Sequence, residues 1–323
     1  MPRRISWKKG MRLTDEVLKA ADNCTSDAIG QALMLASAGR MGLFPSVRPF
    51  QLSLSIARGF VEVESLDCLA MTRGGDIIDV QFDTKFSNTF DSRVQIPQED
   101  EQEFLLTINL IPDSWKDAGD GYQSQDFTFS LVGPKTSISA HSFPIARIVN
   151  KEGWEEDTSL FVPPCLYVSS HSKFEELYQQ FIDLLKAIDE KTKAEIDTQA
   201  KQAISIYWPV VQQILFTANT EHETMTPMCL LSGIQRVVGI FTCACELDDV
   251  LNLEDADTFR AFARIPYNHK NAYLRIKQGL GMCYAISEKI EKFSLLRVEA
   301  QPKPSPKPEP PKDDRRRWNG PNI

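Results

Sequence analysis

The spacing of apolar residues changes near residue 165, and this change limits the chain to two kinds of structure in series. Between residues 50 and 149 apolar and polar residues alternate, which is typical of β-strands with one buried face. Between residues 172 and 298 apolar residues recur every three or four positions, which is typical of amphipathic helices. Pro163 and Pro164 separate the two patterns and can continue neither a helix nor a strand ladder. We therefore expect an α+β protein with a stiff junction.

The first half, residues 1–165, is expected to form a β-rich domain. Its strand-like runs lie at residues 50–56, 60–66, 77–82, 104–111, 127–131 and 143–149, and the run at 104–111 is strongly apolar rather than alternating. Such runs without helices between them predict an antiparallel β-sandwich or barrel rather than a βαβ sheet. An N-terminal helix is expected before them, from the polar start at Thr14 to about Ala38, with a break near Cys24.

The second half, residues 166–298, is expected to form a bundle of about four helices. Its first helix starts near Ser172, a possible N-cap, and carries a stripe of large apolar side chains at helical spacing. We take five members of this stripe as candidate contacts between chains: Phe174, Leu177, Phe181, Leu184 and Ile188. Packing inside one bundle and association between chains both explain the stripe. Farther on, Gly279 and Gly281 are expected to allow close approach of helices.

The C-terminal segment, residues 299–323, has a composition that excludes a packed core. Six prolines between residues 302 and 311 favour extended polyproline II structure. The segment then ends in a basic, aromatic tip formed by Arg315, Arg316, Arg317 and Trp318. It is either a solvated tail or a tethered peptide whose tip binds a partner.

Composition excludes several classes of function. The net charge of −8 argues against nucleic acid as the main partner, because phosphate binding requires a basic face. No run of about 18 apolar residues is present, and no apolar region of a signal peptide follows the basic start. Seven scattered cysteines, an odd number, indicate reduced thiols and a cytoplasmic protein.

Catalytic and metal-binding patterns are not convincing in this sequence. No nucleophile elbow, phosphate-binding loop or zinc-protease motif occurs. Cys243 and Cys245 lie two positions apart in a helical pattern, so their side chains diverge and form a poor metal chelate. His141 lies directly beside Ser142, but neighbouring strand residues point to opposite faces, so we expect a surface or edge histidine. We expect no enzyme activity, no cofactor and no metal.

Four short motifs in a common order resemble the TssK family, the baseplate subunit of bacterial type VI secretion systems. They are Trp7-x-x-Gly10-Met11-x-Leu13, Gly42-Leu43 before a strand, Phe143-Pro-Ile-Ala-Arg147-Ile148, and Phe161-Val-Pro-Pro164 before a long helix. Their order and the gaps between them agree with that family, and the resemblance covers about residues 5–298.

The resemblance implies a β-rich shoulder similar to phage receptor-binding proteins, followed by a helical neck through which three copies associate. It implies a structural adaptor in the cytoplasm, docked at the inner membrane, that links wedge proteins of the TssF and TssG kind to the membrane complex. Trp7 and Met11 would face the wedge or anchor the shoulder. The Phe181 stripe would be partly a seam between chains, so Phe181→Glu would lower the oligomeric state.

The sequence departs from the family after the neck, where residues 299–323 stand in place of a C-terminal head that contacts the membrane complex. This departure fits a divergent system of the Bacteroidetes kind, in which the tip at residues 315–318 docks on a different envelope protein. Two other classes remain open: a phage-type tail or receptor-binding fibre protein, and an enzyme with its site near His141. A sugar-binding groove lined with aromatic residues would favour the fibre protein. An acid and a nucleophile beside His141 would favour the enzyme.

Overall fold

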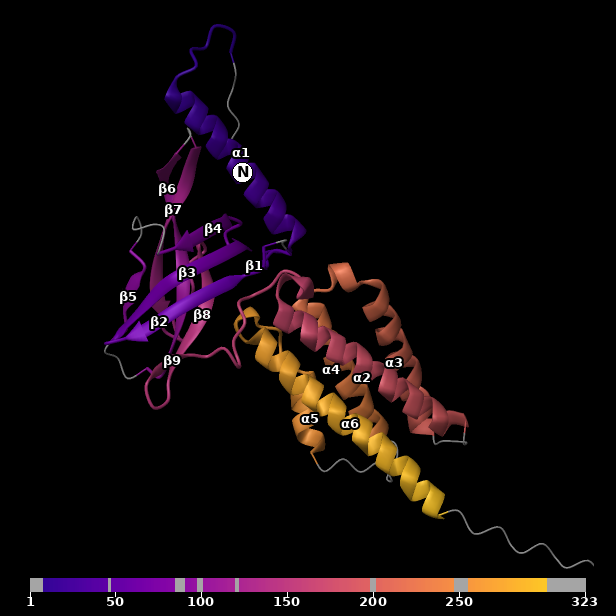
Figure 1. Cartoon of the computed structure of the whole chain (residues 1–323). Helices are drawn as coiled ribbons and strands as arrows, with labels where there is room; N and C mark the ends of the chain where they lie inside the picture. Colours follow the sequence, from indigo (N-terminus) through magenta and orange to yellow (C-terminus); the bar gives the residue numbers. More distant parts are fainter. Residues whose placement is uncertain are drawn as a thin grey trace, which may run out of the picture.

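The computed structural model describes residues 8–45, 48–84, 91–97, 101–119, 122–197, 202–246 and 255–300. A β-rich region comes first in the chain and a helical region second, and Figure 1 shows the two regions beside each other. The N-terminal helix α1, Asp15–Ala36, lies against one end of the β-rich region. The expected α+β class is confirmed.

Two antiparallel sheets form the β-rich region. The first contains β1 (Gly42–Leu43), β2 (Gln51–Ala57), β3 (Phe60–Met71), β4 (Ile77–Asp83) and β5 (Arg93–Gln95). Strand β3 is central to it, because β2 and β1 pair along one edge of β3 and β5 and β4 along the other. The second sheet contains, in the order β7-β6-β8-β9, the strands β6 (Glu103–Gly119), β7 (Tyr122–Val132), β8 (Ser142–Asn150) and β9 (Trp154–Glu156).

The two sheets share a single core. In β3 every second residue over much of the strand is buried, and the same is true of β4. The ring of Phe82 on β4 lies 6.5 Å from the ring of Phe127 and 6.3 Å from that of Phe129, both on β7. These contacts join the two sheets face to face, as in the β-sandwich that the alternation predicts.

Helix α1 is continuous through Cys24, so the break expected there is wrong. The hydroxyl of Thr25 donates to the carbonyl of Ala21 at 3.0 Å, which satisfies this polar side chain within the helix. At the N-terminus, the Thr14 side chain accepts from the backbone N–H of Val17 at 3.4 Å. This bond is a normal N-cap and starts the helix where the sequence predicts it.

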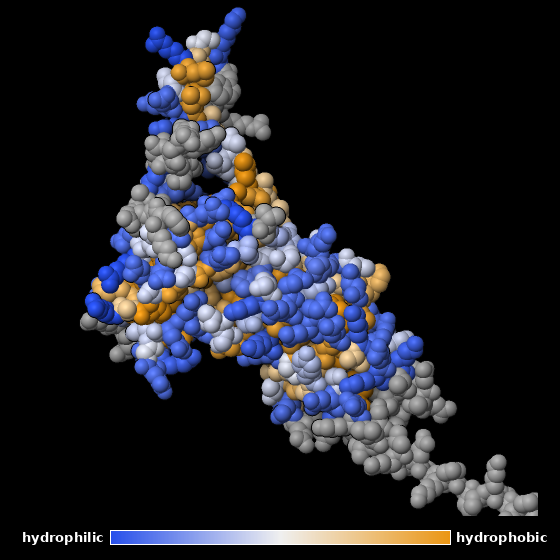
Figure 2. All heavy atoms as spheres, viewed as in Figure 1, coloured by the Kyte–Doolittle hydropathy of each residue, from blue (hydrophilic) through white to orange (hydrophobic). Residues whose placement is uncertain are grey.

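The same helix buries none of its residues. Leu18, Ile29 and Leu35 are exposed, and Figure 2 shows hydrophobic residues in orange near both ends of α1. The helix approaches the sandwich closely where Gly30 of α1 meets Gly75 in the β3–β4 turn. A Cβ on Gly75 would lie only 2.7 Å from the carbonyl oxygen of Gly30, so a larger residue would not fit. Gly75 has a φ of +90°, so glycine is favoured there for its conformation as well.

Four long helices form the helical region. They are α2 (Ser172–Asp197), α3 (Gln202–Thr220), α4 (Pro227–Glu246) and α6 (Ala272–Ala300), and the short α5 (Ala256–Ala263) packs on α4. Helix α2 packs against α3 and α6, and α4 also packs against both, so the four helices close a ring. Helix α3 runs through Pro209 without a second helix starting there.

Helix α4 is the one described helix whose length and apolar composition would allow it to cross a membrane. In this structure it is a core helix of the bundle. Leu231, Val238 and Phe241 are all buried among its neighbours. A helix buried on several sides is apolar for that reason alone.

The expected close approach of helices occurs at Gly279. A Cβ at this position would lie 2.5 Å from Cγ2 of Ile234 on α4 and 2.5 Å from Cζ of Phe262 on α5. Gly281, in contrast, is exposed, and a Cβ there would meet no described atom within 4 Å. The expectation is confirmed for Gly279 and wrong for Gly281.

The apolar stripe of α2 is buried inside a single chain. Its five members have exposed fractions between 0% and 5%: Phe174, Leu177, Phe181, Leu184 and Ile188. The ring of Phe181, for example, packs within 3.6 Å of the position that a Cβ on Gly233 of α4 would occupy. Residues already covered by their own chain have no surface left for another copy. We therefore interpret the stripe as part of the core of the bundle and not as a seam between chains.

We expect Phe181→Ala to lower the free energy of unfolding by about 3–5 kcal/mol, because it removes a buried aromatic side chain and leaves a cavity. Tyr284→Ala, on the exposed side of α6, is the control and should change stability by no more than about 0.5 kcal/mol. Urea unfolding followed by circular dichroism measures both. Equal losses for the two variants would contradict the assignment of Phe181 to the core.

Candidate assembly interface

A short strand-like pairing joins the β-rich region to the helical region. The backbone N–H of Leu43 in β1 donates to the carbonyl of Pro164 at 2.8 Å, and the N–H of Leu166 donates to the carbonyl of Leu43 at 3.0 Å. Leu43 and Cys165 thus form a parallel bridge. A Cβ on Gly42 would lie 2.5 Å from the carbonyl carbon of Cys165, so only glycine fits. Two motifs far apart in sequence, Gly42-Leu43 and residues 161–164, meet at this bridge.

The residues around this bridge are buried. Phe161, Val162 and Leu166 are no more than 6% exposed. Complete burial raises the pKa of the Cys165 thiol well above its usual value. A neutral, inaccessible thiol is a packing element rather than a reactive one. The double-proline segment is therefore part of the folded core between the two regions.

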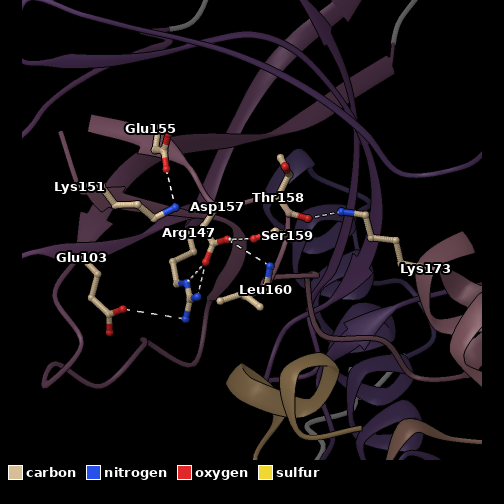
Figure 3. A network of polar contacts seen from close by, with 9 residues as sticks. All are labelled: Glu103, Arg147, Lys151, Glu155, Asp157, Thr158, Ser159, Leu160 and Lys173. Atoms are coloured by element: carbon tan, nitrogen blue, oxygen red, sulfur yellow. Dashed lines mark hydrogen bonds and ion pairs between the residues drawn. The ribbon is translucent and has the colours of Figure 1, made fainter. Parts of the chain in front are cut away.

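Arg147 on β8 holds the segment that leads into this junction (Figure 3). Its Nε donates to Oδ2 of Asp157 at 2.9 Å, and its Nη2 bonds the same oxygen. The other carboxylate oxygen, Oδ1, accepts from the Ser159 hydroxyl at 2.9 Å and from the Leu160 N–H at 3.1 Å. The side chain of Asp157 is 4% exposed. The arginine of the third sequence motif therefore fixes the turn before Phe161.

Charge stabilises this buried pair. Burial acts to raise the pKa of Asp157, but hydrogen bonds from Arg147 and Ser159, together with the charge of Arg147, outweigh it and hold the pKa below its usual value. Asp157 is therefore ionised at neutral pH. The next residue is also tied to the helical region, because Nζ of Lys173 on α2 donates to the carbonyl of Thr158 (Figure 3).

His171 caps α2 and contacts both regions. Its Nδ1 accepts from the backbone N–H of Lys173 at 3.1 Å, and its ring lies 6.1 Å from the ring of Phe50 in the β-rich region. Burial, and to a smaller extent the charge of Lys173, lowers the pKa of His171 to about 4. A neutral imidazole can accept through Nδ1. The capping acceptor is thus His171, not Ser172 as the sequence predicts.

The candidate partner-binding residues lie mostly outside the described part of the chain. Trp7 and the tip formed by Arg315, Arg316, Arg317 and Trp318 belong to segments that the structure does not describe. Met11 is described. It lies just before α1, is 39% exposed, and its N–H donates to the carbonyl of Lys8 at 3.0 Å. Met11 is therefore accessible to a partner.

An apolar surface on α3 was missed by the sequence reasoning. The helix has no charged residue among its 19 positions, and Figure 1 shows it on the side of the bundle away from the sheets. Ile206, Pro209, Gln213 and Phe216 recur at helical spacing and are all exposed. The exposed fraction is 47% for Ile206 and 70% for Phe216. The absence of charged residues from the α3 sequence could have revealed this surface, because a solvent-facing helix normally carries charged residues on its outer face.

Catalytic geometry is incomplete around His141. Its Nδ1 lies 2.9 Å from Oδ2 of Asp76, and the side chain is 48% exposed, as expected for a surface histidine. The Thr72 hydroxyl bonds the same carboxylate oxygen at 2.7 Å, so it donates to the acid rather than to the imidazole. No hydroxyl in the described ranges is hydrogen-bonded to Nε2, where a nucleophile would have to lie. Among those residues no metal-binding group of three ligands occurs either.

We expect Arg147→Met to lower the free energy of unfolding by about 3 kcal/mol, because it leaves the buried carboxylate of Asp157 without its charge partner. The double variant Arg147→Met/Asp157→Leu should recover much of this loss, since no unpaired charge remains. Lys151→Met breaks the exposed pair with Glu155 on the same sheet and serves as the control with little change. A loss in Arg147→Met no larger than in Lys151→Met, measured by urea unfolding, would contradict the role of this pair.

The fold has solved counterparts, although sequence comparison finds none. No protein-family model and no curated protein sequence matches the chain. A chain of the cryo-electron microscopy structure of the type VI secretion system TssK-TssF-TssG baseplate subcomplex matches with a TM-score of 0.56 and 14% identity, over 89% of this chain and 99% of that chain. A crystal structure of TssK matches with a TM-score of 0.59 and 12% identity, over 90% of this chain and 70% of that one. This protein therefore has the TssK fold.

Proposed function

We propose that the chain is a structural subunit of a type VI secretion baseplate, without a catalytic step, at the cytoplasmic face of the inner membrane. The observation that carries this proposal is the extent of the structural match: 89% and 90% of this chain are covered by the two TssK-related structures. The β-rich and helical regions are thus matched together. We propose a shoulder at residues 1–165, a neck at 166–298 and a tail at 299–323.

One matched structure is a complex of TssK with TssF and TssG. We therefore propose TssF- and TssG-like wedge proteins as partners of this chain. The accessible Met11 and the exposed apolar side chains Leu13 and Leu18 at the start of α1 support a wedge contact on this side. We propose that the tip at residues 315–318 binds an envelope protein, so that the chain links wedge and envelope.

We further propose that the chain forms a homotrimer, with α3 as the seam between copies. The apolar stripe of α2 is already buried within one chain and so is not available as this seam. Helix α3 is uncharged and exposes Ile206 and Phe216. Burying a large apolar side chain that is otherwise exposed contributes about 1.5–3 kcal/mol, so association along α3 removes an unfavourable surface from water.

Light scattering behind size exclusion tests the trimer and its seam. We expect a mass near three times 36.5 kDa for the wild type. Ile206→Glu/Phe216→Glu should yield a lower mass, because charges at a desolvated seam are costly. The control Ile77→Glu/Tyr284→Glu alters two exposed apolar residues off α3 and should keep the trimer. A trimer in the α3 variant would refute the seam. A wild-type monomer, with and without wedge proteins, would refute the trimer.

Co-purification tests the partners. A tagged chain co-expressed with the TssF- and TssG-like proteins of its own system should retain both. Met11→Glu should reduce recovery of the wedge proteins, whereas Lys9→Gln, close by and also exposed, should not. Deletion of residues 299–323 should remove the envelope protein and leave wedge recovery unchanged. A properly assembled trimer that retains no wedge protein would contradict the baseplate role, and undiminished envelope recovery after the deletion would contradict the role of the tail.

A further inference from the structure

A basic groove opens between the β-rich and helical regions. Its volume is about 570 Å³, and its walls come from the α1–β1 connection, the β3–β4 turn and the residues around the start of α6. Arg73 comes from the turn, and Lys270 and Arg275 come from the helical region. No aspartate or glutamate is among the residues that the structure places along this groove. Positive charge is therefore concentrated here on a chain whose net charge is −8.

Among the residues that the structure describes, the two arginines of this groove lack the carboxylate partner that several other arginines have. Arg48, Arg147 and Arg260 each form an ion pair with a carboxylate. Within the described ranges neither Arg73 nor Arg275 does so, and Nη1 of Arg275 donates instead to the neutral Oε1 of Gln278 at 3.0 Å. Uncompensated cations at one place create a local field that attracts anions.

Two buried nitrogen atoms that have no partner within the described structure lie at or near the groove. Nε of Arg40 donates to the carbonyl of Ser37 at 2.7 Å, but its Nη1 is buried and bonds no acceptor in the described part of the chain. Nδ1 of His269, which lines the groove, is likewise buried and unpaired among these residues. Burial first, and then the charges of Arg40 and Arg73, lower the pKa of His269, so both guanidinium groups act on this ring. A buried guanidinium N–H without an acceptor is unfavourable, and the charge of Arg40 adds to the positive field near His269.

We propose that this groove binds an acidic segment of a partner protein through its carboxylate side chains. Guanidinium groups bind carboxylates with paired hydrogen bonds, which gives both affinity and orientation. The cations come from separate segments around an open groove, an arrangement suited to several carboxylates of an extended peptide. Met41, Ile265 and Pro266 line the same groove and provide apolar contacts for the peptide between its charges. The inference does not rest on the baseplate role, because it concerns the chain by itself.

Fluorescence anisotropy with a labelled oligoglutamate peptide tests the proposal on the full chain. We expect binding that weakens with added salt, because screening reduces attraction between charges. Arg73→Gln/Arg275→Gln should raise the Kd about tenfold or more, since two charge-assisted contacts are lost. Arg12→Gln/Lys277→Gln removes two exposed cations away from the groove and should leave the Kd unchanged. Circular dichroism and unfolding midpoints establish whether both double variants remain folded. If Arg73→Gln/Arg275→Gln does not fold, Lys270→Gln replaces it as the groove variant.

Several outcomes overturn the proposal. Equal Kd values for the groove variants and the control would place the binding elsewhere. Equal binding of an oligoglutamine peptide with the same label would show that carboxylates are not recognised. Binding of inorganic phosphate without binding of oligoglutamate would identify a small-anion site, and tighter binding of a single-stranded oligonucleotide would identify a nucleic-acid site. None of these results depends on whether wedge proteins co-purify with the chain.

Discussion

Two backbone hydrogen bonds of Leu43 determine how the halves of this molecule are arranged. Leu43 pairs with Ala70 on β3 and also bridges Cys165, so one residue belongs both to the first sheet and to the junction. The two prolines keep the junction extended, and the buried Arg147–Asp157 pair fixes the turn before it. Helix α2 consequently starts at a defined place beside the sandwich, and the bundle is built on α2.

Long periodic segments were predictable from the sequence because their period is visible over many residues. The main strands and the α2 and α4 patterns belong to this class. Strands β1, β5 and β9 have only two or three residues, too few to show alternation, and exist because of partners elsewhere in the chain. The predicted break at Cys24 failed for a different reason. Helix propensity is a weak signal, and the helix accommodates Thr25 because its hydroxyl bonds the carbonyl of Ala21.

The candidate interface was less predictable than the fold. A helical pattern reveals which face is apolar and not what covers it, as the comparison of α2 with α3 shows. Phe181 on α2 is covered by its own chain, whereas Phe216 on α3 is exposed. The basic groove is less visible still in the sequence, because Arg73 and Arg275 come from different regions and meet only after folding. The Gly42-Leu43 and Pro163-Pro164 motifs are far apart in the sequence, and only the structure shows that they touch.

The Leu43 bridge also has a mechanical consequence. Because residues 43 and 165 are bonded side by side, the sandwich between them starts and ends at nearly one point. Tension applied between α1 and the helical bundle therefore follows the short path through Gly42, Leu43 and Leu166 and bypasses the rest of the sandwich. The two strand segments run parallel, so such a pull loads both hydrogen bonds in shear at once. While the bridge holds, β1 is the strand of the sandwich on the direct path of the load. Once its bonds break, the other strands come under tension and can unfold to lengthen the chain.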